Sequence, residues 1–403
     1  MTSPVPGGLP PRPDDRLPGL DVLRGVAALV VVVFHALLVS PELADAFRTG
    51  TAPAGSAASW MLHTPAALIW MGTEAVMLFF VLSGFVLTLP FLRSSGGPPL
   101  RSYYPQRLVR LYVPVVGSLA LAGLSYALLD HTARPGMSWW MAGHDIDPTL
   151  GTVLRDAVLL LGTGWFNSVH WSLRWEVMFS LVLPAMVFVI VRAGQARPVL
   201  WGLVAAGIVG SALVEASSAG YLLMFSIGSL LAAEQRWLRA VAVRLGRRSR
   251  IAWVCGSTLL LLVHTGSWWG GDFVLTPLTV TLGVTGVIVA FAWFPLGAAV
   301  ARVRPLRWVG TRSFSLYLVH EPIVVSTALA LRTSNPLLVA AVALPLSLVV
   351  AAVFFRCVEF PSWQLARRVG RRTRNRAADS APEPGAVRSA SEGVPTGSRP
   401  VGG

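Results

Sequence analysis

The sequence predicts an all-α, polytopic membrane protein with about ten transmembrane helices and with both termini in the cytoplasm. Of its 403 residues, 54% are hydrophobic and 13% are charged, whereas soluble domains carry roughly 25% charged residues. Apolar runs of about 20 residues recur along the chain, and this is the length at which a helix crosses a bilayer. All 33 basic residues are arginines, and they gather in short clusters between the apolar runs.

The apolar runs predict the positions of the individual helices. The expected spans are residues 19–40, 66–92, 110–130, 172–191, 199–216, 220–234, 251–266, 274–296, 313–332 and 337–356. Residues 153–163 are apolar but too short to span, so we expect a re-entrant or surface helix there.

The arginine clusters predict the orientation of the chain. With the N-terminus in the cytoplasm, 25 arginines fall in inner segments and four in outer loops. This asymmetry follows the positive-inside rule and supports the ten-helix topology. The net charge of +14 is therefore interpreted as topological charge, and no nucleic-acid partner is expected. We expect a multi-pass protein of the bacterial inner (plasma) membrane, with membrane lipid as its surroundings.

The composition also predicts how the chain is divided. Residues 1–16 are expected to form a cytoplasmic N-terminal tail, residues 17–368 a membrane domain, and residues 369–403 a basic and then disordered cytoplasmic tail. The first apolar run is too long for a signal peptide and no small-residue cleavage site follows it, so the first helix should remain as an anchor.

Arg24 and His35 stand out because they interrupt the first apolar run. Eleven residues correspond to three helical turns plus roughly 20°, so the two side chains share one stripe about 16 Å apart along the helix. Ionisable residues inside a membrane are costly and usually face a bundle interior or a wet cavity. This spacing favours a functional role over a purely structural one.

The topology predicts two layers of polar residues at different depths. The outer layer would contain His35, Glu74 and Glu176, where a carboxylate could orient a basic imidazole. The inner layer would contain arginines suited to phosphate groups, together with further polar residues. Its members are Arg24, Arg107, Arg110, Tyr317, His320 and Glu359.

Several of these residues also have structural interpretations. Arg107 and Arg110 could serve only as topology anchors, and Glu359 could simply pair with an arginine. Glu74 could bridge packed helices, and His320 with Glu321 could form a polar kink. No metal site and no bound cofactor are expected, because metal-ligand spacings and nucleotide-binding fingerprints are missing from the sequence.

Six segments, in this order, resemble motifs of the membrane acyltransferase family three, a family of integral membrane O-acyltransferases. They are LDVLRGVAALVVVVFH, GTEAVMLFFVLSGFVLT, RSYYPQRLVRLYVP, HWSLRWEVMFSLVLP, GTRSFSLYLVHEPIV and VEFPSWQLARR, within residues 17–368. Glu74 departs from the second motif, where a small residue is usual.

The resemblance implies transfer of an acyl group from a cytosolic acyl-CoA, with acetyl-CoA as the expected co-substrate. The acceptor would be a hydroxyl of a carbohydrate, a glycolipid or a macrolide-like metabolite, as in O-acetylation of the cell envelope. His35 and Glu176 would be catalytic, with His320 as the alternative base, and Arg24, Arg107 and Arg110 would bind the donor. The supporting residues would be Glu74, Ser172, Tyr317, His320 and Glu359.

A transporter or flippase for a polar glycan or metabolite is the alternative function, since such proteins also carry intramembrane His, Glu and Arg. Transporters often show two similar halves with paired broken helices. No internal repeat is apparent here, which favours the enzyme.

Overall fold

The computed structural model describes residues 17–93, 98–214, 217–265 and 275–379, and within these ranges the chain forms helices and no β-strand. The all-α prediction is therefore confirmed. Each expected span coincides with a long helix. These helices are α1 (Pro18–Leu37), α4 (Gly72–Arg93), α5 (Leu100–Leu128), α8 (His170–Ala193), α9 (Arg197–Leu213), α10 (Ser217–Ala233), α12 (Arg247–Thr265), α13 (Thr276–Trp293), α16 (Ser313–Leu331) and α17 (Pro336–Phe354).

Shorter elements connect the long helices or extend them. They are α2 (Pro41–Thr49), α3 (Ala57–His63), η2 (Pro65–Ile69), α6 (Trp139–Ala142), α7 (Leu150–Val158), η3 (Gly194–Ala196), α11 (Gln235–Arg244), α14 (Pro295–Val300), α15 (Arg304–Thr311), η5 (Phe355–Glu359) and α18 (Phe360–Asp379). The element η5 is a π-helical turn that joins α17 to α18 without a break.

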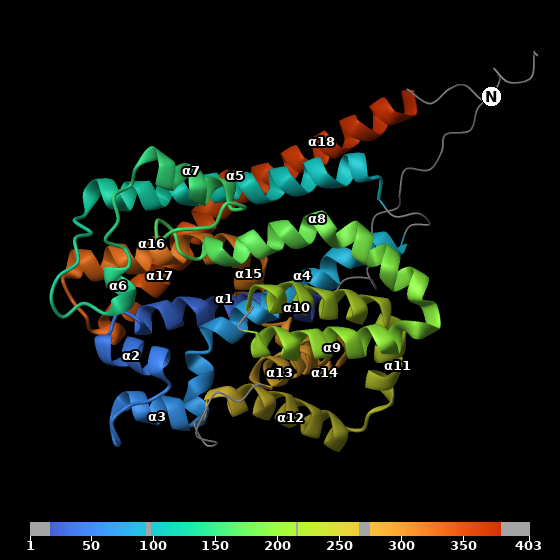
Figure 1. The fold of residues 1–403 in the computed structure, drawn as a ribbon, viewed down its shortest axis with the longest axis horizontal. Helices are drawn as coiled ribbons and strands as arrows, with labels where there is room; N and C mark the ends of the chain where they lie inside the picture. Colours follow the sequence, from blue (N-terminus) through green and yellow to red (C-terminus); the bar gives the residue numbers. More distant parts are fainter. Residues whose placement is uncertain (1–16, 94–97, 215–216, 266–274, 380–403) are drawn as a thin grey trace, which may run out of the picture.

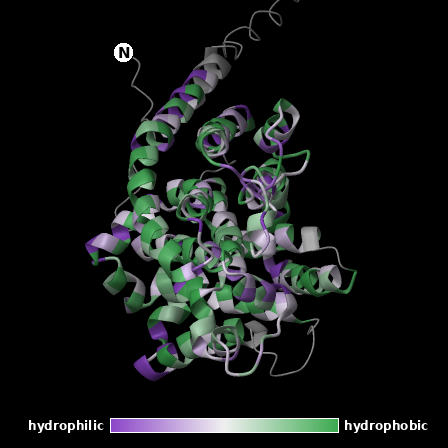
Figure 2. Cartoon of the chain, turned by 90° about the vertical axis from the view of Figure 1, so that its left-hand side faces the viewer, coloured by the Kyte–Doolittle hydropathy of each residue, from purple (hydrophilic) through white to green (hydrophobic). Residues whose placement is uncertain are grey.

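The long helices run roughly side by side, as Figure 1 shows. Helices α2, α3 and α6 lie at one end of the bundle, and α11 lies at the opposite end. Green, hydrophobic residues predominate along the helices in Figure 2. Among the described residues, seven segments are long and apolar enough to cross a membrane, and two of them, His170–Leu213 and Pro336–Thr373, each include two long helices. The chain is therefore a polytopic membrane protein, and the count of ten crossings and the cytoplasmic termini stay predictions.

Three boundaries differ from the expected ones. The second span begins at Gly72 rather than at 66, because Pro65 starts the separate 3-10 turn η2. The third begins at Leu100 rather than at 110, directly after Pro99, so Arg107 and Arg110 lie inside α5. The C-terminal helix α18 continues through Asp379, so part of the predicted tail is helical and continuous with the bundle. The predicted tail 1–16 and residues 380–403 lie outside the described residues.

Helices α1 and α16 form the centre of the bundle. Of their apolar windows, 61% and 78% of residues are buried, against 33% for the segment that contains α8 and α9. Helix α1 contacts α4, α15, α16 and α17. Most side chains on α1 and α16 are therefore enclosed by protein.

Helices α4 and α10 approach one another closely at a pair of glycines. A Cβ atom on Gly84 would lie 2.0 Å from the carbonyl oxygen of Phe225, and one on Gly228 would lie 1.9 Å from that of Val81. Thr88 donates a hydrogen bond of 2.9 Å to Ser229 beside this crossing. Small residues at such a crossing let the two backbones approach, as is common in membrane helices.

We predict that Gly84→Ala destabilises the protein by about 1–3 kcal/mol or more, because the added methyl group meets backbone that cannot move aside. Gly202→Ala is the matched control, since a Cβ atom added at Gly202 would have no other atom within 4 Å. Thermal unfolding of both purified variants in detergent provides the measurement. Equal unfolding temperatures for the two variants would contradict the close crossing.

Candidate active site

An arginine cavity of about 390 Å³ lies where α1, α5, α8, α16 and α18 converge. It contains the three predicted arginines, Arg24, Arg107 and Arg110, together with the acids Asp21, Glu176 and Glu359. The other lining residues are Val86, Leu111, Gly310, Thr311, Ser313, Phe314, Phe355 and Trp363. The structure thus brings residues far apart in the sequence into one charged cavity.

Two of the arginines are fixed by neighbouring side chains. The Nη2 atom of Arg107 forms an ion pair with the Glu176 carboxylate, and its Nε donates to the Ser180 hydroxyl at 2.9 Å. The guanidinium carbon of Arg110 lies 5.1 Å from the ring centre of Trp363, in a cation–π contact. These contacts hold the charged groups in place before a ligand arrives.

A narrow cavity of about 40 Å³ continues from the arginine cavity toward the centre of the bundle. The two cavities share Arg24, Glu176, Ser313 and Phe314. Deeper in the narrow cavity, the hydroxyl groups of Ser172 and Tyr317 are 2.7 Å apart. The Tyr317 ring in turn lies 5.7 Å, centre to centre, from the imidazole of His320. The two adjoining cavities therefore extend from the arginines to Tyr317, whose ring lies next to His320.

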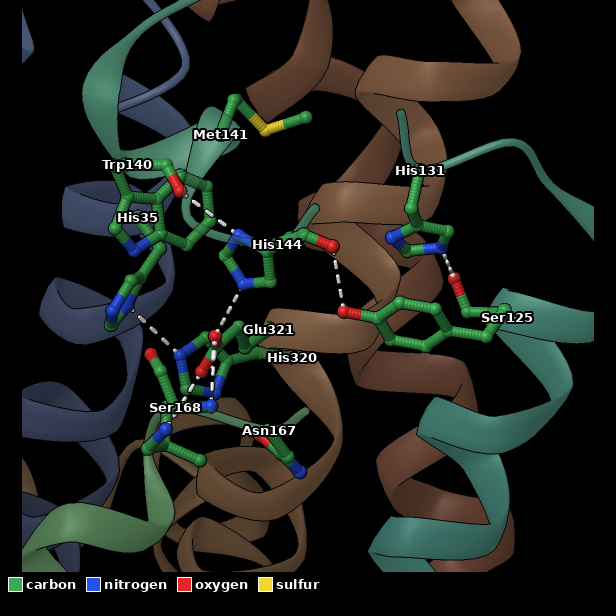
Figure 3. A network of polar contacts seen from close by, with 12 residues as sticks. His35, Ser125, His131, Trp140, Met141, His144, Asn167, Ser168, His320 and Glu321 are labelled. Carbon is green, nitrogen blue, oxygen red and sulfur yellow. Dashed lines mark hydrogen bonds and ion pairs between the residues drawn. The ribbon is translucent and has the colours of Figure 1, made fainter. Parts of the chain in front are cut away.

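Four titratable side chains gather beyond Tyr317, as Figure 3 shows. His35 of α1 contacts His320 of α16, with 3.1 Å between His35 Nδ1 and His320 Nε2. His144, from the outer loop, lies 2.8 Å through its Nε2 from Glu321 Oε1. His144, His320 and Glu321 are buried, and His35 is partly exposed. We call these four residues the histidine cluster.

The hydrogen bonds of the two paired histidines assign their protons. His320 Nδ1 faces the carbonyl oxygens of Tyr317 at 2.7 Å and Leu316 at 3.2 Å, so it must carry hydrogen. In a neutral ring its Nε2 is then an acceptor, and His35 Nδ1 donates both to it and to the Val31 carbonyl at 2.9 Å. His35 Nε2 is consequently the nitrogen with a free lone pair.

Glu321 holds an irregular segment at membrane depth. Its Oε1 accepts the amide hydrogen of Ser168 at 3.0 Å, and its Oε2 accepts that of Val169 at 2.8 Å, directly before α8. The first amides of a helix lack intrahelical partners, and no water in the bilayer core can replace them. A carboxylate from α16 therefore caps the N-terminus of α8.

The segments that flank the α7–α8 connection pack against the central part of α5. The hydroxyl of Tyr112, near the middle of α5, donates to the Val158 carbonyl at the end of α7. Ser118, also in mid-helix, lies 2.9 Å from His170 at the start of α8. The helix α7 (Leu150–Val158) overlaps the first part of the predicted short helix at 153–163, and the choice between a re-entrant and a surface helix stays a prediction.

The depth of α8 corrects one prediction. Because α8 begins beside the middle of α5, Glu176 lies about 9 Å further inward than His170. Its carboxylate pairs with Arg107 instead of His35, which does not fit the predicted role of orienting the imidazole, whereas the alternative role of lining the acceptor site stays a prediction. The carboxylate that lies beside the histidines is that of Glu321, which the sequence predicted only as part of a polar kink with His320.

The remaining predicted residues fall into two groups. Ser172 and Tyr317 meet in the narrow cavity, and Glu359 lines the arginine cavity, where its carboxylate accepts from the amide and hydroxyl of Ser315. Glu74 is buried in the first turn of α4. His144, which lies 177 residues before Glu321 in the sequence, had no signal of its own apart from being a histidine in the longest outer loop.

We predict that Glu321→Gln exposes the N-terminus of α8, because an amide cannot accept all three hydrogen bonds. Each buried donor left without a partner costs about 1–3 kcal/mol. Hydrogen exchange at the Ser168 and Val169 amides should accelerate while exchange in α17 stays unchanged. The control is Glu42→Gln at the exposed outer helix α2, and unchanged exchange in the Glu321 variant would refute the capping role.

We also predict that Arg107 and Glu176 are energetically coupled. A double-mutant cycle with Arg107→Ala and Glu176→Ala should give a coupling energy within about 0.5–3 kcal/mol, because each single change leaves a shielded charge without its partner. Unfolding temperatures of the four proteins supply the measurement. Additive effects would show that the ion pair contributes nothing to stability.

Comparison with known proteins gives two matches. The model of an acyltransferase domain matches residues 17–356, which include all four residues of the histidine cluster. A protein of Streptomyces mycarofaciens, called acyltransferase MdmB, is 27% identical over 342 residues, or 78% of this chain and 81% of the relative. No solved structure matches the chain significantly.

Proposed function

Because the chain belongs to the acyltransferase family whose domain model covers residues 17–356, it is an enzyme that transfers acyl groups, and we propose that a cytosolic acyl-CoA is its donor. Acetyl-CoA is the form expected. The proposed acceptor is a hydroxyl group of a carbohydrate, a glycolipid or a macrolide-like metabolite. The proposed location is the inner (plasma) membrane, with the arginine cavity on the cytoplasmic side.

One observation carries this proposal: the cavities that begin at the arginines extend to Tyr317, next to a histidine pair with a free lone pair. Arginines suit the phosphates of a coenzyme because their planar, permanently charged forks bind phosphate oxygens in pairs. Helical rise places His35 about 16 Å beyond Arg24 along α1. A long, flexible thioester arm fits this separation between a phosphate-binding region and a base.

The reaction requires one proton transfer on each side of the thioester carbonyl. His35 Nε2 takes the proton of the acceptor hydroxyl as its oxygen attacks the carbonyl carbon. The new C–O bond forms, the C–S bond breaks, and the departing sulfur receives the proton held by the histidine pair. The products are the acyl ester and the free thiol of coenzyme A, so atoms and charges balance.

The charge that develops on His35 has a nearby counter-charge. Glu321 follows His320 directly in α16 and is buried with the cluster. His144 bridges Glu321 Oε1 and the Trp140 carbonyl through its two ring nitrogens, so the carboxylate also fixes the position of this histidine. Glu321 is thus a positioning residue that fixes His144 and α8 and stabilises positive charge at the histidine pair.

We predict that His35→Gln lowers acyl transfer by about 10²–10⁴-fold, the usual contribution of a general base, while acyl-CoA still binds. The measurement is transfer from labelled acetyl-CoA in membranes that hold equal amounts of each protein, with lipid, glycan and small-metabolite fractions analysed for labelled ester. His63→Gln, in the outer helix α3, is the control.

Near-normal transfer by the His35 variant together with loss in His320→Gln would move the base to His320. A wild-type protein that neither binds acetyl-CoA nor yields a labelled ester would contradict the proposed function itself.

A further inference from the structure

A third cavity, of about 510 Å³, opens between α4, the first turns of α5, and α18. It shares Arg107, Arg110 and Trp363 with the arginine cavity, so the two cavities adjoin at these side chains. We call it the α5–α18 cavity. Its other lining residues are Leu87, Pro90, Phe91, Pro98, Ser102, Tyr103, Gln106, Ala366 and Arg367.

The two adjoining cavities differ in charge. In the arginine cavity, three acids balance three arginines. Among the described residues that line the α5–α18 cavity, Arg107, Arg110 and Arg367 are charged and none is acidic. Arg107 is already paired with Glu176, whereas Arg367 reaches the cavity from the other wall, on α18. Arg107 and Arg110 line both cavities, so Arg367 is the one charge that the α5–α18 cavity adds, and no acid among the described lining residues of either cavity remains to balance it.

Aromatic rings line the same cavity. Phe91 and Tyr103 meet edge to face with ring centres 5.1 Å apart, and the Tyr103 hydroxyl is fixed by a hydrogen bond to the Ser180 carbonyl. Trp363 stands at the junction of the two cavities under the guanidinium of Arg110. Flat rings beside arginines are the combination that recognises a nucleobase attached to phosphates, through stacking and charge-assisted hydrogen bonds.

The wall formed by α18 is held firmly against α5. A Cβ atom on Gly370 would lie 2.0 Å from the side-chain amide nitrogen of Gln106, so the two helices are in close contact there. Trp363 and Arg367 are four residues apart on α18, which places them on the same helical face. Both residues line the cavity from this face of α18.

We propose that the α5–α18 cavity binds the 3′-phosphorylated ADP portion of the acyl-CoA donor, and that the neutral arm of the coenzyme crosses the arginine cavity toward Tyr317. This inference rests on the proposed function. It assigns Trp363 and Arg367 to the nucleotide, and both lie beyond the residues matched by the acyltransferase domain model. It also shifts the expected role of Arg24 from binding phosphate toward placing the thioester end.

The experiment uses three probes with the full-length protein in detergent: acetyl-CoA, acetyl-pantetheine, which lacks the nucleotide, and 3′-phospho-ADP, which lacks the arm. In Trp363→Leu and Arg367→Ala, the dissociation constant for acetyl-CoA should rise by at least about tenfold. Competition by 3′-phospho-ADP should be lost in both variants. Use of acetyl-pantetheine as a donor should be unchanged in Arg367→Ala, because Arg367 does not line the arginine cavity.

Two matched controls separate the site from general effects. Arg372→Ala removes an exposed arginine on α18 that does not line the cavity, and Trp308→Leu removes a tryptophan in another arginine contact, with Arg312 at 4.4 Å. Both should bind acetyl-CoA as the wild type does. Wild-type affinity for acetyl-CoA in the Trp363 and Arg367 variants, or a loss of acetyl-pantetheine use in Arg367→Ala, would overturn the nucleotide assignment. Failure of the wild type to bind acetyl-CoA would instead overturn the proposed function.

Discussion

The need to satisfy buried polar groups in a medium without water determines this site. Glu321 meets that need for the exposed backbone amides at the start of α8 and for His144 of the outer loop. Because the same carboxylate adjoins the His35–His320 pair, the contact that caps the start of α8 also places negative charge beside the histidines. The architecture of the loop and the proposed acid–base chemistry therefore depend on one side chain.

The position of α8 links this outer region to the arginines. A helix that begins at mid-depth brings its second turn close to the inner end of α5, and there Glu176 meets Arg107. Ser172, four residues earlier, meets Tyr317 between the two regions. A single helix thus contributes to the capped segment, the narrow cavity and the arginine cavity, in that order from its N-terminus.

The fold was largely predictable because its signals are local. Apolar length and arginine placement predicted helices at all the right positions, and errors were confined to ends such as the start of α5 at Leu100. The grouping of Arg24 with Arg107 and Arg110 also followed from topology, since depth along a straight helix depends only on rise per residue.

The depth rule failed for Glu176, because it assumed that α8 starts at the membrane surface. Helix depth could not predict the pairing of His144 with Glu321, because His144 lies in the loop between α5 and α8 and its position depends on how that loop folds. The sequence signal for Glu321 was its position next to a histidine in the middle of an apolar helix. Its partner, His144, could be identified only from the contacts in the structure.

The π-helical turn η5 determines how α18 is rotated about its own axis relative to α17. Such a turn contains one more residue than the corresponding α-helical turn. If the extra residue were lost, every side chain of α18 would rotate by about 100° around the helix axis relative to α17. Trp363 and Arg367 would then turn away from α5, although no residue in either cavity had changed. The orientation of an entire cavity wall thus depends on the length of one short turn, which can be altered by a deletion as readily as by a substitution.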